Sequence, residues 1–139
     1  MKKFLTIFMA TLMLVSIAMF ATGCGISDDW KETRDKLVDA GFDVTTATSP
    51  YSIESYVEDL GMSVDGDDVE CVMIAFKGKQ TIVIAFCKDK ATAKDLVKQA
   101  EDFESDFADM IDVSRDKIEI GRDGKVAYMG HKEAVKAAK

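Results

Sequence analysis

The chain has 139 residues, of which 47% are hydrophobic, and carries a formal net charge of −7 at pH 7. An acidic surface of this kind argues against a nucleic-acid partner and against lying flat on anionic lipid headgroups. The three cysteines and the single histidine, His131, show no zinc-ligand spacing, so we expect no metal centre and no other cofactor.

The beginning of the chain differs in composition from the rest. Lys2 and Lys3 precede an apolar run over residues 4–20, and small residues follow it. A charged start, an apolar middle and small residues before a cleavage site are typical of a secretory signal peptide. The run is also shorter than the stretch of about 20 residues that spans a bilayer as a helix. We therefore predict that residues 1–23 are a signal peptide.

The end of this segment indicates which kind of signal it is. Ala21-Thr22-Gly23-Cys24 resembles the lipobox of bacterial lipoproteins, in which the cysteine sulfur carries a diacylglycerol. The resemblance implies that Cys24 is lipidated and that residues 24–27 tether the protein to the extracytoplasmic face of the cell membrane. Two or three acyl chains on one cysteine hold a protein stably at a bilayer. The alternative is an ordinary secretory signal, cut nearby, that leaves Cys24 unmodified.

Short elements follow this tether in quick succession. Ser27 is expected to cap a first helix that Gly41 ends, and the alternating residues 42–45 predict a short strand. Ser49-Pro50 then predicts the start of a second helix, which ends at Gly61.

Two nearly continuous apolar runs, residues 69–76 and 81–87, predict a hairpin at the centre of a sheet with both faces covered. Cys71 and Cys87 lie in these two runs. A two-residue turn at Gly78-Lys79 would place their thiols on opposite faces of the sheet, whereas a three-residue loop would pair them directly. Because export permits a disulfide without requiring one, two outcomes stay open: a Cys71–Cys87 disulfide, or two small buried thiols.

A long helix over residues 90–111 is the strongest periodic signal, since apolar side chains recur there at intervals of three and four. One face of this helix is acidic. Carboxylates late in a helix oppose its dipole and repel one another, so a cation, a basic partner or nearby lysines would stabilise them. This face is either a surface for a partner or a cation, or the solvated side of an acidic protein. Its residues are Glu101, Asp102, Glu104, Asp106, Asp109 and Asp112.

The last part of the chain predicts a second hairpin over residues 117–130. Asp-Gly is favoured in two-residue turns, and a turn at Asp123-Gly124 would pair Ile120 with Ala127. Residues 131–139 then predict a short closing helix.

The order of these elements predicts the fold class. From Phe42 onward the order is strand, helix, two strands, helix, two strands, helix. We expect residues 28–139 to form one α+β domain, with a mainly antiparallel sheet of about five strands and helices packed on it. The first six elements match the split βαβ pattern of ferredoxin-like folds, with an added edge strand.

Taken whole, the chain resembles small envelope lipoproteins of Gram-positive bacteria. The resemblance is carried by the lipobox, by the stretch over residues 37–42 and by Lys88-Asp89-Lys90-Ala91-Thr92-Ala93-Lys94 at the start of the long helix. It implies a lipid-anchored extracytoplasmic protein and transfers no functional residue.

No catalytic motif accompanies these features, so we do not expect an enzyme. His131 has no recognisable nucleophile or orienting acid, and we expect it to be a surface residue at the start of a helix. The leading hypothesis is a non-catalytic binding or adaptor domain that meets an envelope protein or a small ligand. The first alternative is cation binding by the acidic helix face. The second is an enzyme whose motif is not recognisable.

Overall fold

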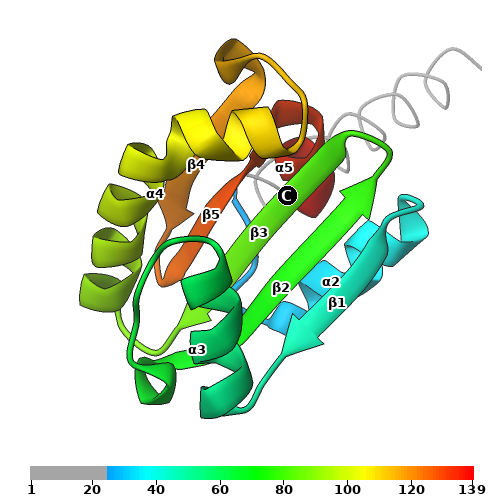
Figure 1. Cartoon of the computed structure of the whole chain (residues 1–139). Coiled ribbons are helices and arrows are strands. Elements are labelled where there is room, and N and C mark those ends of the chain that lie inside the picture. Colours follow the sequence, from blue (N-terminus) through cyan, green and yellow to red (C-terminus); the bar gives the residue numbers. More distant parts are fainter. Residues whose placement is uncertain (1–24) are drawn as a thin grey trace, which may run out of the picture.

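Five strands form one antiparallel sheet in the order β1-β2-β3-β5-β4, in a computed structural model that describes residues 25–139 (Figure 1). The predicted α+β class is therefore confirmed. Two one-turn 3-10 helices, Gly66–Asp68 and Arg115–Lys117, precede β2 and β4. The main elements in chain order are α2 (Trp30–Asp39), β1 (Asp43–Ala47), α3 (Pro50–Asp59), β2 (Val69–Lys77), β3 (Gln80–Cys87), α4 (Lys90–Met110), β4 (Ile118–Asp123), β5 (Val126–His131) and α5 (Lys132–Ala138).

The sheet separates two hydrophobic cores. Helices α3 and α4 cover one face and α2 and α5 cover the other, which we call the α3/α4 face and the α2/α5 face (Figure 1). Successive side chains of a strand point to opposite faces. Val72 and Val83 accordingly enter the core under α3 and α4, whereas Met73 and Ile84 enter the core under α2 and α5. This alternation explains why β2 and β3 are apolar along nearly their whole length.

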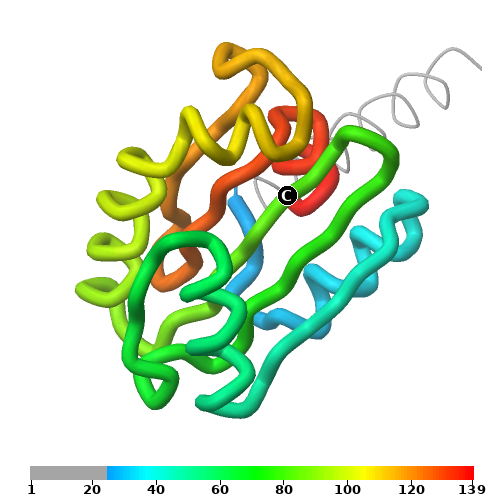
Figure 2. The backbone as a smooth tube through the Cα atoms, viewed as in Figure 1, coloured from blue at the N-terminus to red at the C-terminus, as the bar shows by residue number. Residues whose placement is uncertain are grey.

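The strand order was only partly predictable. Strands β3 and β4 flank β5, so β3, α4 and β4 form one split βαβ unit. In Figure 2 the chain runs from β3 through α4 to the far edge of the sheet and then returns as β5. Strands β1 and β2, in contrast, are direct antiparallel neighbours, with no strand between them. The ferredoxin-like pattern thus describes the second half of the sheet, and β4 rather than the last strand occupies the edge.

Helix starts are fixed by side-chain caps. The Ser49 hydroxyl accepts a hydrogen bond from the Ser52 amide at 3.3 Å, as its place before Pro50 predicts. The first helix begins later than expected, because Asp29 rather than Ser27 caps it and accepts from the Lys31 amide at 3.0 Å. Within residues 25–139, none of the helices combines the length and the apolar composition needed to cross a membrane.

The expected tether over residues 24–27 is wrong for the part that the structure describes. Ile26 is only 4% exposed and belongs to the core of the α2/α5 face. Its backbone N–H donates to the Asp123 carboxylate at 2.8 Å. Cys24 lies outside the described residues. Residues 26 and 27 are therefore part of the folded domain and not a flexible spacer.

The register of the first hairpin settles the state of the cysteines. Lys77 pairs with Gln80 across the two-residue turn, and an irregularity between Val69 and Cys71 pairs Cys71 with Phe86. Cys71 enters the core of the α2/α5 face and Cys87 the core of the α3/α4 face. Both thiols are free and buried. The disulfide alternative is wrong because the sheet itself lies between the two sulfur atoms.

The second hairpin differs from the predicted register. Its turn is Gly124-Lys125, with Gly124 at a φ of 62°, so Asp123 pairs with Val126 and Ile120 pairs with Met129 instead of Ala127. The left-handed backbone conformation falls at the first turn position, which the glycine takes without strain. The expected and observed pairings differ by an even number of residues, so the side chains predicted to share a face still do so.

Burial raises the pKa of the Cys71 thiol to about 11, assisted by the nearby Glu70 carboxylate, and the pKa of Cys87 to about 12, assisted by Asp89 and Asp68. We predict that neither thiol reacts with a disulfide reagent at pH 8 until the protein is unfolded.

The thiols of the unfolded chain ionise from pH 9.0 upward while those of the folded chain stay protonated. The free energy of unfolding should therefore be insensitive to these groups below that pH and fall above it.

Urea titrations across this pH range test the prediction. Cys71→Ala and Cys87→Ala should each make the alkaline decline shallower, whatever they cost at neutral pH. An unchanged slope in both variants would assign the decline to other groups.

Candidate functional site

An open groove lies where three separate segments meet at one end of the sheet. These are the β2–β3 turn, the α4–β4 loop and the junction of β5 with α5. Its volume of about 540 Å³ falls within the range of small-molecule sites, roughly 300–1,000 Å³. The lining residues are Lys79, Ala108, Asp109, Asp112, Val113, Ser114, Lys117 and His131.

The end of α4 shapes one wall of this groove. The Val113 amide donates to the Ala108 carbonyl at 3.0 Å and the Asp112 amide to that of Asp109 at 3.2 Å, which is the hydrogen-bond pattern of a Schellman cap. Asp112 takes the left-handed conformation that this cap requires, with a φ of 56°. It is the only non-glycine residue with a positive φ within residues 25–139.

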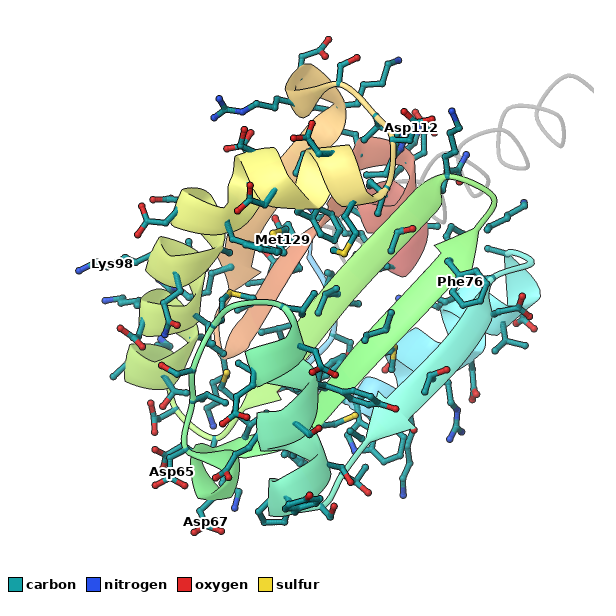
Figure 3. All side chains as sticks on the ribbon, viewed as in Figure 1. Asp65, Asp67, Phe76, Lys98, Asp112 and Met129 are labelled. Atoms are coloured by element: carbon teal, nitrogen blue, oxygen red, sulfur yellow. The ribbon has the colours of Figure 1, made fainter. Side chains whose placement is uncertain are left out.

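One ion pair crosses the groove. Lys79 Nζ of the β2–β3 turn lies 2.9 Å from a carboxylate oxygen of Asp112, which Figure 3 labels at the end of α4. The two side chains are 67% and 86% exposed, so the pair contributes only about 0.5 kcal/mol to stability. Water or a ligand therefore displaces it at little cost.

His131 closes the groove at the start of α5. Its Nδ1 accepts a hydrogen bond from the Glu133 amide at 3.2 Å and thereby caps the helix. In the neutral ring this bond leaves the hydrogen on Nε2. The expectation of a helix-start residue is confirmed, and the ring makes no second hydrogen bond within the described part of the chain.

Charges of both signs line the groove. Lys79 and Lys117 are cationic, Asp109 and Asp112 are anionic, and Ser114 adds a hydroxyl group. Such a lining is complementary to a molecule that carries both an anionic and a cationic group. It is poorly matched to a purely apolar ligand.

The six predicted acidic residues do not form one site. Asp109 and Asp112 line the groove, Glu104 lies 3.8 Å from the Arg115 guanidinium, and the others are exposed. Eight steps along α4 separate Glu101 from Asp109, which is roughly 12 Å at 1.5 Å per residue, and Asp112 lies beyond the end of the helix. Within residues 25–139, no three His, Cys, Asp or Glu side chains are grouped so that they would hold a metal ion. The cation-binding alternative therefore gains no support from the geometry.

A second space between α3 and α4 is a packing gap. It measures about 30 Å³ and is lined by apolar side chains such as Val57, Leu96 and Met129, the last labelled in Figure 3. Small-molecule sites measure roughly 300–1,000 Å³, which is at least ten times this volume. It is too small for a ligand.

Sequence reasoning singled out three residues of the groove, Asp109, Asp112 and His131, but for other reasons. It missed Lys79, Ser114 and Lys117. No local pattern connects these residues, because they come from two separate segments, the β2–β3 turn and the α4–β4 loop, which only tertiary packing brings together.

The backbone at Asp112 gives a stability test of the groove wall. Asp112→Gly and Asp112→Ala both remove the ion pair with Lys79, but only glycine adopts a positive φ without strain. We predict that the glycine variant is more stable than the alanine variant by about 1 kcal/mol in urea unfolding. At Ser105, in the middle of α4, the same pair of substitutions should show the opposite order. Equal stability of the two Asp112 variants would mean that the cap rearranges.

Comparisons with models of protein families, with curated proteins and with solved structures give no match to this chain.

Proposed function

We propose that this protein is a lipoprotein, anchored through Cys24 to the extracytoplasmic face of the cell membrane, whose domain is a non-catalytic binding module. The anchor is proposed because Ala21-Thr22-Gly23-Cys24 resembles a lipobox. It is supported by the position of the two cores, whose buried members run from Ile26 to Ala138. Cleavage before Cys24 would therefore remove none of these core residues.

The binding activity is assigned to the groove between the β2–β3 turn and the α4–β4 loop. The observation that carries this assignment is the meeting of Lys79, Lys117, Asp109 and Asp112 around one open space of ligand size. The ion pair between Lys79 and Asp112 is weak. A bound molecule that carries both charges would break this pair and give each of the two side chains a new partner of opposite charge. Free amino acids and short peptides have this chemistry.

The anchor is tested by the variant Cys24→Ala. We predict that the wild-type protein incorporates labelled palmitate and stays with the membrane fraction after a high-salt wash, because covalent acyl chains and not surface charge hold it there. The variant should lose the label and leave the membrane fraction. A wild-type protein that carries no lipid, or a variant that remains bound, would contradict the anchor.

The groove is tested by NMR titration of residues 25–139 with a panel of free amino acids and dipeptides. We predict that at least one compound shifts the amide signals of residues 109–117 and of His131. Lys117→Gln should then weaken binding by about tenfold, which corresponds to about 1.4 kcal/mol. Lys98→Gln is the matched control, since Lys98 is an exposed lysine of α4 that does not line the groove (Figure 3).

Two outcomes would refute this assignment. One is a panel that shifts no amide signal at millimolar concentration. The other is a loss of binding in Lys98→Gln as large as that in Lys117→Gln, which would reflect net charge rather than a site.

A further inference from the structure

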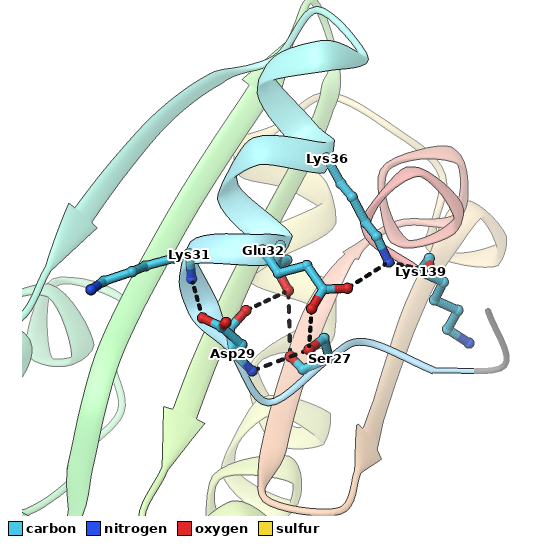
Figure 4. A network of polar contacts seen from close by, with 7 residues as sticks. Ser27, Asp29, Lys31, Glu32, Lys36 and Lys139 are labelled. Atoms are coloured by element: carbon cyan, nitrogen blue, oxygen red, sulfur yellow. Dashed lines mark hydrogen bonds and ion pairs between the residues drawn. The ribbon is translucent and has the colours of Figure 1, made fainter. Parts of the chain in front are cut away.

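The chain enters the domain along the α2/α5 face, close to the end of β4. Figure 4 shows the segment before α2 passing across β5 and β4. The buried side chain of Ile26 holds this segment to the core, and the 2.8 Å hydrogen bond to Asp123 holds its backbone to the last residue of β4. A side chain on Gly25 would lie only 3.0 Å from the Asp123 carboxyl carbon, so the chain is closely packed there too.

A polar network fixes the next residue, Ser27. Its hydroxyl accepts from the Asp29 amide at 3.2 Å and donates to Glu32 at 3.3 Å (Figure 4). Lys36 then lies 3.6 Å from Glu32 and donates to the Lys139 carbonyl at 3.2 Å. The entering segment is thus joined to α2 and, through Lys36, to the end of the chain after α5.

This docking leaves almost no spacer between the proposed lipid and the domain. Cys24 is the residue before Gly25, and consecutive Cα atoms lie about 3.8 Å apart. An acyl anchor on Cys24 would therefore hold the domain directly at the headgroups, at the place where Ile26 enters the fold.

The charge distribution agrees with this place of entry. Residues 50–117, which include α3, α4 and the loop that follows α4, contain 16 acidic and eight basic residues. The other residues of 25–139, which include α2, β4, β5 and α5, contain nine acidic and eight basic residues. Nearly all of the net negative charge of the described chain thus belongs to the part that holds α3 and α4, and an anionic membrane surface repels that part.

From these observations we infer that the lipidated domain lies with its α2/α5 face, near the β4–β5 turn, against the bilayer, and displays its acidic α3/α4 face outward. The inference rests on the proposed lipid anchor and adds a fixed orientation to it. The partner of the α2/α5 face is the lipid headgroup layer of the protein's own membrane. The groove lies at the opposite end of β5, five residues or roughly 17 Å along the strand, and stays open.

The orientation is tested with a fluorophore on single added cysteines. Lys136→Cys places the label on α5, and Lys98→Cys places it on α4, both at exposed positions. Cys71 and Cys87 are buried and stay unlabelled in the folded protein. Full-length lipidated protein is reconstituted in vesicles of phosphatidylethanolamine and phosphatidylglycerol in equal parts, with a quencher on some headgroups. We expect the α5 label to be quenched several-fold more than the α4 label.

A linker variant provides the control for docking. Ten Gly/Ser residues inserted between Cys24 and Gly25 give a flexible spacer with a reach of roughly 17 Å, which releases the domain without altering it. The difference between the two labels should then largely disappear. Equal quenching without the linker, or stronger quenching on α4, would overturn the orientation while leaving the anchor intact. Wild-type protein that carries no lipid would instead overturn the anchor, and the orientation with it.

Discussion

The pairing of β2 with β3 is the constraint on which the rest of the structure depends. Both strands are apolar on both faces, so neither face is stable in water, and helices must cover each of them. Val72 and Met73 are adjacent in the chain, but their side chains pack in different cores. A slip by one residue would move each set of side chains into the other core. The packing lost in both cores is the free-energy cost that holds the register. The two-layer helix cover and the separation of the two thiols both follow from this pair of strands.

Many elements of the fold were predictable because patterns among neighbouring residues specify them. The three- and four-residue spacing of α4, the Ser49-Pro50 cap and the two central apolar runs each specify an element from neighbouring residues. Strand order is not local in this way. The position of β5 between β3 and β4 depends on how α4 packs across the sheet, and no single segment encodes it.

The groove shows the same limit for function. Asp109 and Asp112 stood out as members of an acidic helix face, yet the structure gives them a different context, with Lys79 and Lys117 opposite. Lysines on an exposed turn carry no signal in a sequence, since most surfaces have them. What makes these informative is the Schellman cap at Asp112, which turns the chain so that four charges of mixed sign face one space.

The register of the second hairpin connects the fold to the proposed anchor. A turn at Asp123-Gly124, as the sequence suggested, would have placed Asp123 within the turn. With Gly124-Lys125 as the turn, Asp123 is instead the last residue of β4, and its carboxylate accepts the N–H of Ile26. A one-residue difference in turn position thus provides the contact that binds the start of the domain. If Cys24 carries the proposed lipid, a domain held in this way cannot rotate freely about it, and a partner in the envelope would meet the same acidic face each time.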